Sequence, residues 1–251
     1  MRQPSKKTAL ITGASRNIGK AISYSLSSEV TDLICCARNQ QDLDILVGKL
    51  TSRTCTAHAF AIDLTQSQSV VKLMGWMSDR DLSPDILVHN LGGSLGFADP
   101  LCSDEEFSKV WRYNVGVGVE LNRHIIPQMC ERKYGRIVHL STLSARTYTG
   151  NLPYVSAKCA LEGYVKTASK NFAKDNVLIN AVAPGLVDLE GRFFSNLKKT
   201  EPERFIRYME DHISTHRMVS PEEVAEAVKF LCSNSAKSMV GVVLPVDGGW
   251  I

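Results

Sequence analysis

Two side chains in the second half of the chain have the types and the spacing of an acid–base pair. Tyr154 and Lys158 are four residues apart, and none of the other six tyrosines has a lysine at this spacing. On a helix the two side chains would lie on one face, one turn apart. A free phenol has a pKa of about 10, and a neighbouring ammonium lowers that value by favouring the phenolate. We therefore expect Tyr154 to exchange a proton with a substrate at neutral pH.

A run of small residues near the amino terminus has the composition of a phosphate-binding loop. An expected strand over 8–12 leads directly into Gly13-Ala14-Ser15-Arg16-Asn17-Ile18-Gly19, and an expected helix follows. Backbone N–H groups in such a loop can approach a pyrophosphate, and the helix N-terminus adds partial positive charge. Asn17 replaces the middle glycine, and asparagine is the next-best residue for a left-handed backbone. The loop predicts a dinucleotide site; the alternative is a tight turn without a ligand.

Arginine, rather than an acid, follows the second expected strand, which ends Cys35-Cys36-Ala37-Arg38-Asn39. In a dinucleotide fold an acid at this place binds the 2′-hydroxyl of NAD, whereas arginine suits the 2′-phosphate of NADP. We expect Arg38 and Arg16 to converge on that phosphate. This favours NADP(H), with NAD(H) as the second choice. The alternative is that both arginines are surface residues at the rim of the sheet.

Apolar runs of strand length alternate with helical patterns along the chain. The expected strands are 8–12, 33–37, 57–62, 86–89, 136–140, 177–183 and 241–245, and the expected helices are 18–27, 41–50, 67–78, 104–130, 154–173 and 221–232. Such alternation indicates β-α-β crossovers and a parallel sheet covered on both faces. Residues 187–219 lack a strand pattern and mix aromatic with charged side chains. We expect them to form a lid over the substrate.

Composition excludes several classes of protein. The chain has 251 residues, 44% of them hydrophobic and 22% charged, which is ordinary for a soluble domain. The net charge of +3 gives no reason to expect nucleic acid or a membrane surface as partner. The first apolar stretch, 9–11, is too short for a signal peptide, so we expect a cytoplasmic protein. The seven cysteines form no C-x-x-C pair, so we expect reduced thiols and no metal site.

The ordered series of motifs resembles the short-chain dehydrogenase/reductase family, in particular its 3-oxoacyl-carrier-protein reductases. In chain order the motifs are the T-G-x-x-x-G-x-G-like loop at 12–19, Asp63-Leu64, His89-Asn90-Leu91-Gly92, Asn114, Ser141-Thr142, Tyr154 with Lys158, Pro184-Gly185 and Asp247-Gly248-Gly249. The resemblance implies an α/β fold in which residues 1–251 form a single Rossmann-type domain. Its doubly wound parallel sheet would have about seven strands in the order 3-2-1-4-5-6-7, with helices on both faces and the lid at 187–219.

The resemblance also implies roles for site residues. Tyr154 would be the general acid in carbonyl reduction and the general base in alcohol oxidation. Lys158 would lower its pKa and bond the nicotinamide ribose, and Asn114 would hold a water in a proton relay. A hydroxyl after the fifth strand would polarise the substrate oxygen; counting back from Tyr154 selects Ser141, whereas reading along the strand selects Thr142, and both are kept. The implied cofactor-binding residues are Gly13, Ser15, Arg16, Asn17, Ile18, Gly19, Arg38, Asn39, Asp63, Leu64, Asn90, Gly92, Tyr154, Lys158, Pro184, Gly185 and Val187.

Two departures from the family pattern stand out. His89 occupies the place of a strand-bracing asparagine, and Asp188 and Leu189 occupy a stretch where a threonine commonly bonds the nicotinamide carboxamide. The implied function is hydride transfer between cofactor and a small or carrier-bound carbonyl or secondary alcohol, first of all a 3-oxoacyl-type ketone. The alternatives are a sugar or polyol dehydrogenase, an isomerase or dehydratase on the same fold, and a catalytically weak NADP-binding sensor or scaffold. A homodimer or homotetramer is expected, formed through the helices 104–130 and 154–173.

Overall fold

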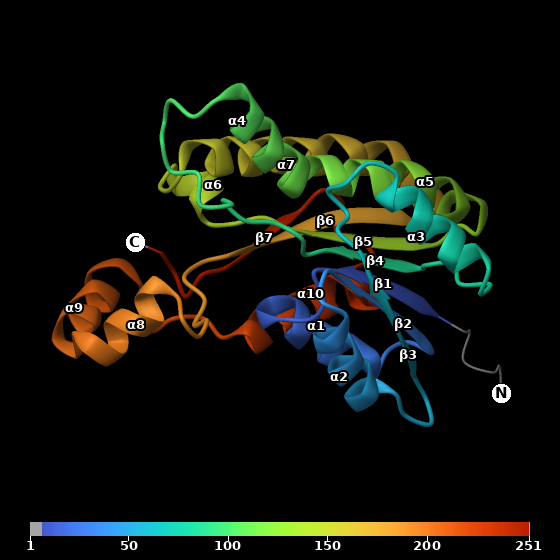
Figure 1. The fold of residues 1–251 in the computed structure, drawn as a ribbon, viewed down its shortest axis with the longest axis horizontal. Coiled ribbons are helices and arrows are strands. Elements are labelled where there is room, and N and C mark those ends of the chain that lie inside the picture. Colours follow the sequence, from blue (N-terminus) through green and yellow to red (C-terminus); the bar gives the residue numbers. More distant parts are fainter. Residues whose placement is uncertain (1–6, 251) are drawn as a thin grey trace.

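Seven parallel strands form one sheet in the order β3-β2-β1-β4-β5-β6-β7, which confirms the expected fold (Figure 1). The computed structural model describes residues 7–250, so residues 1–6 and 251 of the expected domain lie outside the described part. The strands are β1 (Thr8–Thr12), β2 (Asp32–Ala37), β3 (Thr56–Ala61), β4 (Ile86–His89), β5 (Gly135–Leu140), β6 (Val177–Pro184) and β7 (Val243–Val246). Each lies within two residues of its predicted bounds.

The central strands are buried along their whole length. Every residue of β1, β4, β5 and β6 is buried, as expected for strands covered by helices on both faces. Helices α1 (Asn17–Ser27), α2 (Gln40–Leu50) and α10 (Pro221–Cys232) cover one face, and α3 (Ser69–Ser78), α5 (Val117–Glu131) and α7 (Leu152–Phe172) cover the other (Figure 1). A separate hydrophobic cluster fills the space on each side of the sheet. Among residues 7–250, no helix is long and apolar enough to span a bilayer.

The predicted single helix over 104–130 is wrong in one respect. Helix α4 (Asp104–Trp111) is followed by a π-helical turn, η1 (Arg112–Gly116), before α5 begins. Asn114 lies in that turn, and its side chain bonds both the N–H and the C=O of Gly93. A π turn holds one extra residue, which lets Asn114 reach the sheet without breaking the helix. The helix therefore continues through the π turn, but the side chains after the turn are rotated about the helix axis relative to those before it.

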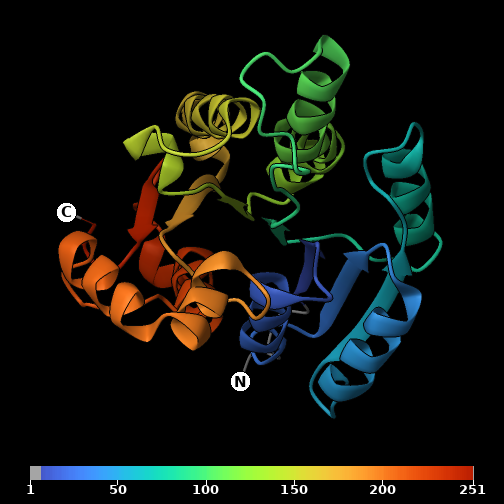
Figure 2. The same cartoon turned by 60° about the vertical axis from the view of Figure 1, so that its left-hand side comes forward.

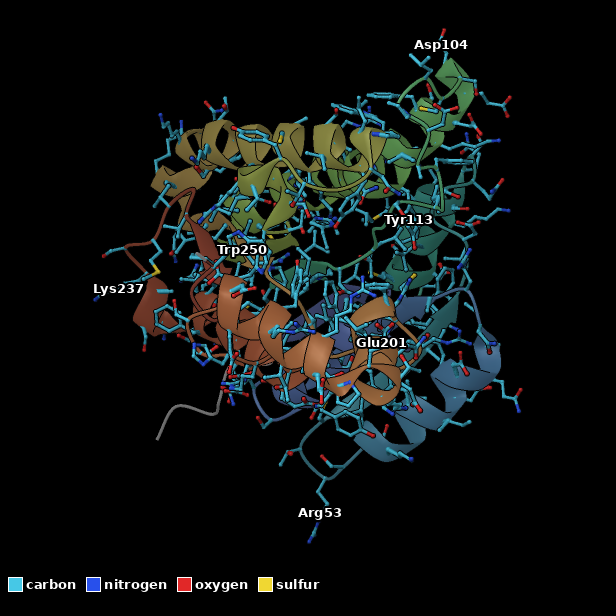
Figure 3. The ribbon with its side chains drawn as sticks, turned by 90° about the vertical axis from the view of Figure 1, so that its left-hand side faces the viewer. Arg53, Asp104, Tyr113, Glu201, Lys237 and Trp250 are labelled. Atoms are coloured by element: carbon cyan, nitrogen blue, oxygen red, sulfur yellow. The ribbon has the colours of Figure 1, made fainter. Side chains whose placement is uncertain are left out.

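Residues 188–218 stand outside the sheet at one end (Figure 2). They contain two helices that the pattern did not predict, α8 (Phe193–Thr200) and α9 (Pro202–His212), joined at Glu201 (Figure 3). Phe205, Met209 and Ile213 form a small core of their own beneath these helices. Val187 and Val219 pair as a parallel bridge, so the segment leaves and rejoins the body at one place. The remaining short elements are α6 (Ser144–Thr147), η2 (Ala173–Asp175) and η3 (Asn234–Ala236).

Candidate active site

The loop after β1 has the geometry of an anion cradle. Gly13 has φ +65° and Asn17 has φ +50°, so the expected left-handed asparagine is confirmed. A Cβ on Gly19 would collide with the carbonyl oxygen of Gly13, so loop and helix approach closely only because a glycine stands there. Within the described residues, the N-cap of α1, Arg16, makes no side-chain hydrogen bond to the helix end. The first N–H groups of α1 are therefore available to an anion.

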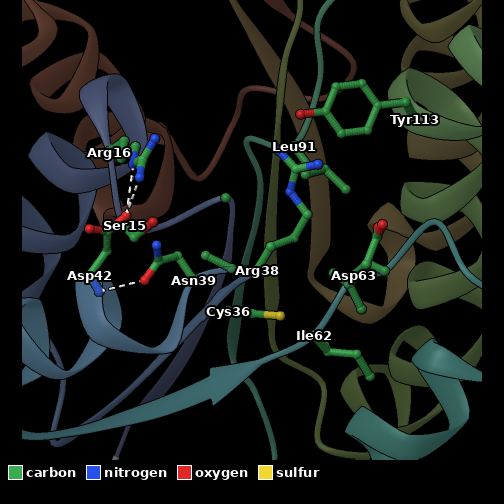
Figure 4. A pocket seen from close by; sticks show the side chains of 13 residues that line it. Ser15, Arg16, Cys36, Arg38, Asn39, Asp42, Ile62, Asp63, Leu91 and Tyr113 are labelled. Atoms are coloured by element: carbon green, nitrogen blue, oxygen red, sulfur yellow. Dashed lines mark hydrogen bonds and ion pairs between the residues drawn. The ribbon is translucent and has the colours of Figure 1, made fainter. Parts of the chain in front are cut away.

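A cavity of about 430 Å³ opens beside this loop (Figure 4). Its lining residues are Gly13, Ser15, Arg16, Cys36, Ala37, Arg38, Asn39, Asp42, Ile62, Asp63, Leu64, Leu91 and Tyr113. All but Asp42 and Tyr113 come from the carboxyl ends of β1, β2, β3 and β4 or directly follow them, where ligands bind in open α/β sheets. Most of the adenosine-side residues predicted from the sequence thus meet in one place.

The two arginines line the same cavity but have different partners. The Arg16 guanidinium bonds Asp42 at 2.6 Å, whereas Arg38 extends into the cavity separately (Figure 4). Asp42 was not predicted; it lies in the first turn of α2, where the Asn39 side chain caps its N–H at 3.0 Å. Burial raises the pKa of Asp63, but hydrogen bonds from Thr65 and the charge of Arg38 outweigh it, so the net pKa is lowered. An ionised carboxylate therefore faces Arg38.

Tyr154 and Lys158 both lie on α7, with the ammonium 5.8 Å from the centre of the phenol ring. Burial raises the pKa of Tyr154, and a hydrogen bond from the Thr142 hydroxyl offsets this only in part. The expected lowering by Lys158 is therefore not seen, because the lysine Nζ turns to the Leu140 carbonyl at 2.6 Å. At neutral pH the phenol keeps its proton and can donate it.

The two hydroxyls after β5 point to different partners. Ser141 is buried and its Oγ donates to Glu162 at 2.7 Å. Thr142 is the hydroxyl that reaches Tyr154. Adjacent residues of an extended segment face opposite sides, so one of them must turn away from the phenol. The structure places Ser141 on the turned-away side.

Lys158 lies in a narrow crevice between the ends of β4 and β5. Its side chain is buried, and burial lowers its pKa to about 8, although the Glu162 carboxylate acts to raise it. A Cβ on Gly92 would lie 3.0 Å from the lysine Nζ and 2.8 Å from Asn114 Oδ1. Asn114 also donates to the Val110 carbonyl at 2.8 Å. Gly92 therefore separates the two polar groups and leaves room for both.

The remaining predicted residues lie at the ends of β4 and β6 and at the start of α1. Asn90 donates to the Gly13 carbonyl at 2.9 Å, which ties the end of β4 to the glycine loop. Ile18 and Val187 pack against the core, and Gly185 lies so close to Asp247 that a Cβ would be 2.7 Å from its Cα. Asp188 accepts a hydrogen bond from Ser195 of α8 at 2.6 Å. The segment that lacks the usual threonine is thus bonded to α8.

Sequence reasoning missed Asp42, Tyr113 and Glu162. Glu162 was detectable, since it follows Lys158 by four residues and extends the Tyr154–Lys158 face of the helix. Tyr113 precedes Asn114, and only the π turn brings it to the cavity. Asp42 has no local signal, because its partner Arg16 comes from another element.

Comparison with known proteins agrees with this geometry. Residues 13–251 match the family profile described as Enoyl-(Acyl carrier protein) reductase. The chain is 31% identical over 246 residues to the 3-oxoacyl-[acyl-carrier-protein] reductase FabG of Rickettsia prowazekii, covering 98% of this chain and 97% of that one. The L-sorbose reductase from Gluconobacter frateurii, solved with NADPH and L-sorbose, is 29% identical with a TM-score of 0.89, covering 98% and 97%. The 3-oxoacyl (acyl-carrier-protein) reductase from Agrobacterium tumefaciens C58, solved with NADP bound, is 27% identical with a TM-score of 0.87, covering 97% and 93%.

Proposed function

The chain belongs to the short-chain dehydrogenase/reductase family of oxidoreductases, and on this premise we propose that it reduces a ketone with NADPH. The observation that carries the proposal is the meeting of Tyr154, Thr142 and Lys158 at one place. A helical phenol beside a buried ammonium and a hydroxyl serves proton transfer to a carbonyl oxygen. A protein that only binds a dinucleotide needs no such group.

The residues around the cavity suit a phosphorylated dinucleotide. The free N–H groups of α1 and the close approach at Gly19 suit the pyrophosphate, and Arg16 and Arg38 suit a 2′-phosphate. Asp63 and Leu64 would lie beside the adenine; Asn90 and Gly92 would follow along the chain toward Lys158. The backbone of Pro184, Gly185 and Val187 would face the nicotinamide. When bound, the cofactor supplies the hydride.

Proton transfer is assigned to this chain's own side chains. Tyr154, which burial keeps protonated well above neutral pH, donates to the substrate oxygen. The Lys158 ammonium then stabilises the phenolate, and Asn114 holds the water through which the proton is replaced. The protonated phenol is the form that acts as a general acid, and we therefore propose reduction as the working direction.

We assign the substrate-polarising hydroxyl to Thr142 and a structural role to Ser141. Thr142→Val keeps the shape and removes the hydroxyl, and it should lower kcat/KM by about 100- to 1000-fold, as for other oxyanion donors. Ser141→Ala leaves the Glu162 carboxylate without its donor and should cost about 1–3 kcal/mol of unfolding free energy with kcat/KM little changed. Activity lost in Ser141→Ala and kept in Thr142→Val would reverse the assignment.

The proposed substrate is a 3-oxoacyl thioester, because curated relatives over nearly the whole chain reduce this class by name. A ketose or polyol is the second candidate, supported by the likeness to the L-sorbose reductase. NADPH consumption would be measured against acetoacetyl thioesters and ketoses, with Tyr154→Phe as the matched control. NADPH binding with no turnover, or turnover unaffected by Tyr154→Phe, would favour the sensor or scaffold. Product formed without net NADPH consumption would favour the isomerase.

We also propose that the chain acts in the cytoplasm as a homodimer or homotetramer, assembled through α5 and α7. Light scattering of the purified protein gives the number of subunits. Cell fractionation gives the compartment. A monomer at micromolar concentration would contradict the proposed assembly.

A further inference from the structure

A buried polar cluster lies directly behind the crevice of Lys158. His89 ends β4 and is paired in the sheet with His139 of β5, and the two rings stack with centroids 4.2 Å apart. The amide of Asn122, from α5, lies beside both rings: its Oδ1 is 2.8 Å from His89 Nε2 and its Nδ2 is 3.3 Å from His139 Nε2. We call His89, Asn122 and His139 the histidine clamp. Its members are 6%, 1% and 1% exposed.

The hydrogen bonds assign the protons of the clamp. Asn122 Oδ1 can only accept, so His89 carries its proton on Nε2; Asn122 Nδ2 can only donate, so His139 Nε2 is bare. His139 is thereby neutral, whereas the charge of His89 depends on its burial. Burial lowers the pKa of His89 to about 4, and burial, the neighbouring His89 and the charge of Lys158 lower that of His139. His89 Nδ1 finds no hydrogen-bond partner among residues 7–250, a cost that the stack and the Asn122 contacts must offset.

The clamp stands where the two strands part. Beyond His89 the chain turns to β1, since the N–H groups of Asn90 and Leu91 both donate to Thr12 Oγ1 at 3.1 and 3.2 Å. Beyond His139 the backbone that leaves β5 continues alongside β6, since Ser141 N–H donates to the Val182 carbonyl at 2.7 Å. The stacked rings are the last cross-strand pair of β4 and β5 before this split.

Lys158 occupies the opening that the split creates. The residue after His139, Leu140, accepts from its Nζ at 2.6 Å, and Gly92, three residues after His89, forms the opposite wall. Gly118 of α5 leaves space for the rings, because a Cβ there would lie 3.2 Å from His139 Cε1 and 3.4 Å from His89 Nδ1. The width of the crevice between Leu140 and Gly92 therefore depends on the positions of the His89 and His139 rings.

We propose that the histidine clamp is a positioning element that sets the width of the crevice and so the place of Lys158. It supplies the bracing for which the family uses an asparagine at position 89. This inference rests on the proposed function for its kinetic consequence, but the position of the lysine can be measured without turnover. His89 and His139 are positioning residues, since they act through the strand ends.

Matched variants separate the two features of the clamp. His89→Phe keeps a ring and removes the donor to Asn122, whereas His89→Gln keeps a donor of similar reach and removes the ring. Tyr164→Phe is the control, because it removes the hydroxyl that accepts from Asn122 Nδ2 at 3.0 Å and keeps the ring that packs edge-on against His139 with centroids 5.9 Å apart. We expect kcat to fall about 10- to 100-fold in His89→Phe, the loss that follows displacement of a catalytic group by about 1 Å. His89→Gln should recover most of it, and Tyr164→Phe should stay within about twofold of the parent, because it leaves both strand ends in place.

The pKa of Lys158, measured by NMR of lysine labelled at the ε-carbon, is the readout that a merely structural role would not move. It should rise from about 8 toward 10.5 in His89→Phe as the crevice widens and admits water. A folded His89→Phe with the parent's kcat and lysine pKa, altered in melting temperature alone, would overturn the proposal. If His89→Phe does not fold, His139→Phe carries the same test while keeping the His89 donor. A parent protein without ketone turnover would refute the proposed function and leave the NMR test of the clamp intact.

Discussion

The neutral histidine pair should make the fold sensitive to mild acid. The pKa of His89 is about 4 in the folded chain because of burial, against 6.5 for the free side chain. The unfolded state therefore binds the proton more tightly. The stabilisation due to a neutral His89 is complete above pH 6.5 and is lost as the pH falls toward 4. The difference corresponds to about 3 kcal/mol in total, of which about 2 kcal/mol falls between pH 7 and pH 5.

His89→Phe isolates this contribution from those of all other titrating groups. The variant should be about 1–3 kcal/mol less stable than the parent at pH 7, because the buried Asn122 Oδ1 loses its donor. On going to pH 5 it should lose about 2 kcal/mol less than the parent loses, since nothing at position 89 takes up a proton. Urea unfolding at both pH values, followed by tryptophan fluorescence at one protein concentration, gives the four free energies.

Tyr164→Phe is again the control, because it removes a hydroxyl from the same cluster and leaves His89 in place. It should show the parent's full loss between the two pH values. If the parent and His89→Phe lose the same free energy on acidification, His89 is not held neutral by burial.

Three further predictions concern the site. Arg38→Asp should raise the KM for NADPH about 10- to 100-fold and leave the KM for NADH little changed, because a charge-assisted contact to the 2′-phosphate is lost. An unchanged preference for NADPH over NADH would contradict the 2′-phosphate site. Gly92→Ala places a methyl 3.0 Å from Lys158 Nζ and should lower kcat about tenfold. Gly48→Ala is the control, because Gly48 is helical and nothing lies within 4 Å of an added Cβ; it should raise the free energy of unfolding by up to about 1 kcal/mol at unchanged kcat. Since burial sets the pKa of Lys158 to about 8, the ammonium is lost above that pH and kcat/KM should decline there; a profile flat to pH 10 would count against its role.

The sheet was predictable because each strand is an apolar run between clear breaks. The predicted bounds of β1 and β4 agree with the structure, and the order follows from the resemblance to the family. The π turn at 112–116 was not predictable from periodicity, since it exists to let Asn114 bond Gly93, a contact between distant segments. Helices α8 and α9 were missed because they pack on each other and on the carboxyl-terminal Trp250 rather than on the sheet. Their hydrophobic faces are correspondingly narrow.

The candidate site was predictable as a set of residues but not as a set of contacts. Spacing along one helix selected Tyr154 and Lys158, and the structure brings both to the crevice. We propose Thr142 rather than Ser141 because Ser141 bonds Glu162, and this contact with another element could not be predicted from the sequence. The pairing of Arg16 with Asp42 was not predictable for the same reason, because Asp42 approaches Arg16 only in the folded chain.

The bridge between Val187 and Val219 has a consequence for how this scaffold can change. A segment that departs and returns through neighbouring points can be lengthened, shortened or exchanged without shifting the strands on which it stands. Tyr154 and the glycine loop belong to those strands and their connecting helices. We expect residues 188–218 to cover the substrate, and substrate recognition could then change in these residues while Tyr154 and the glycine loop stay in place.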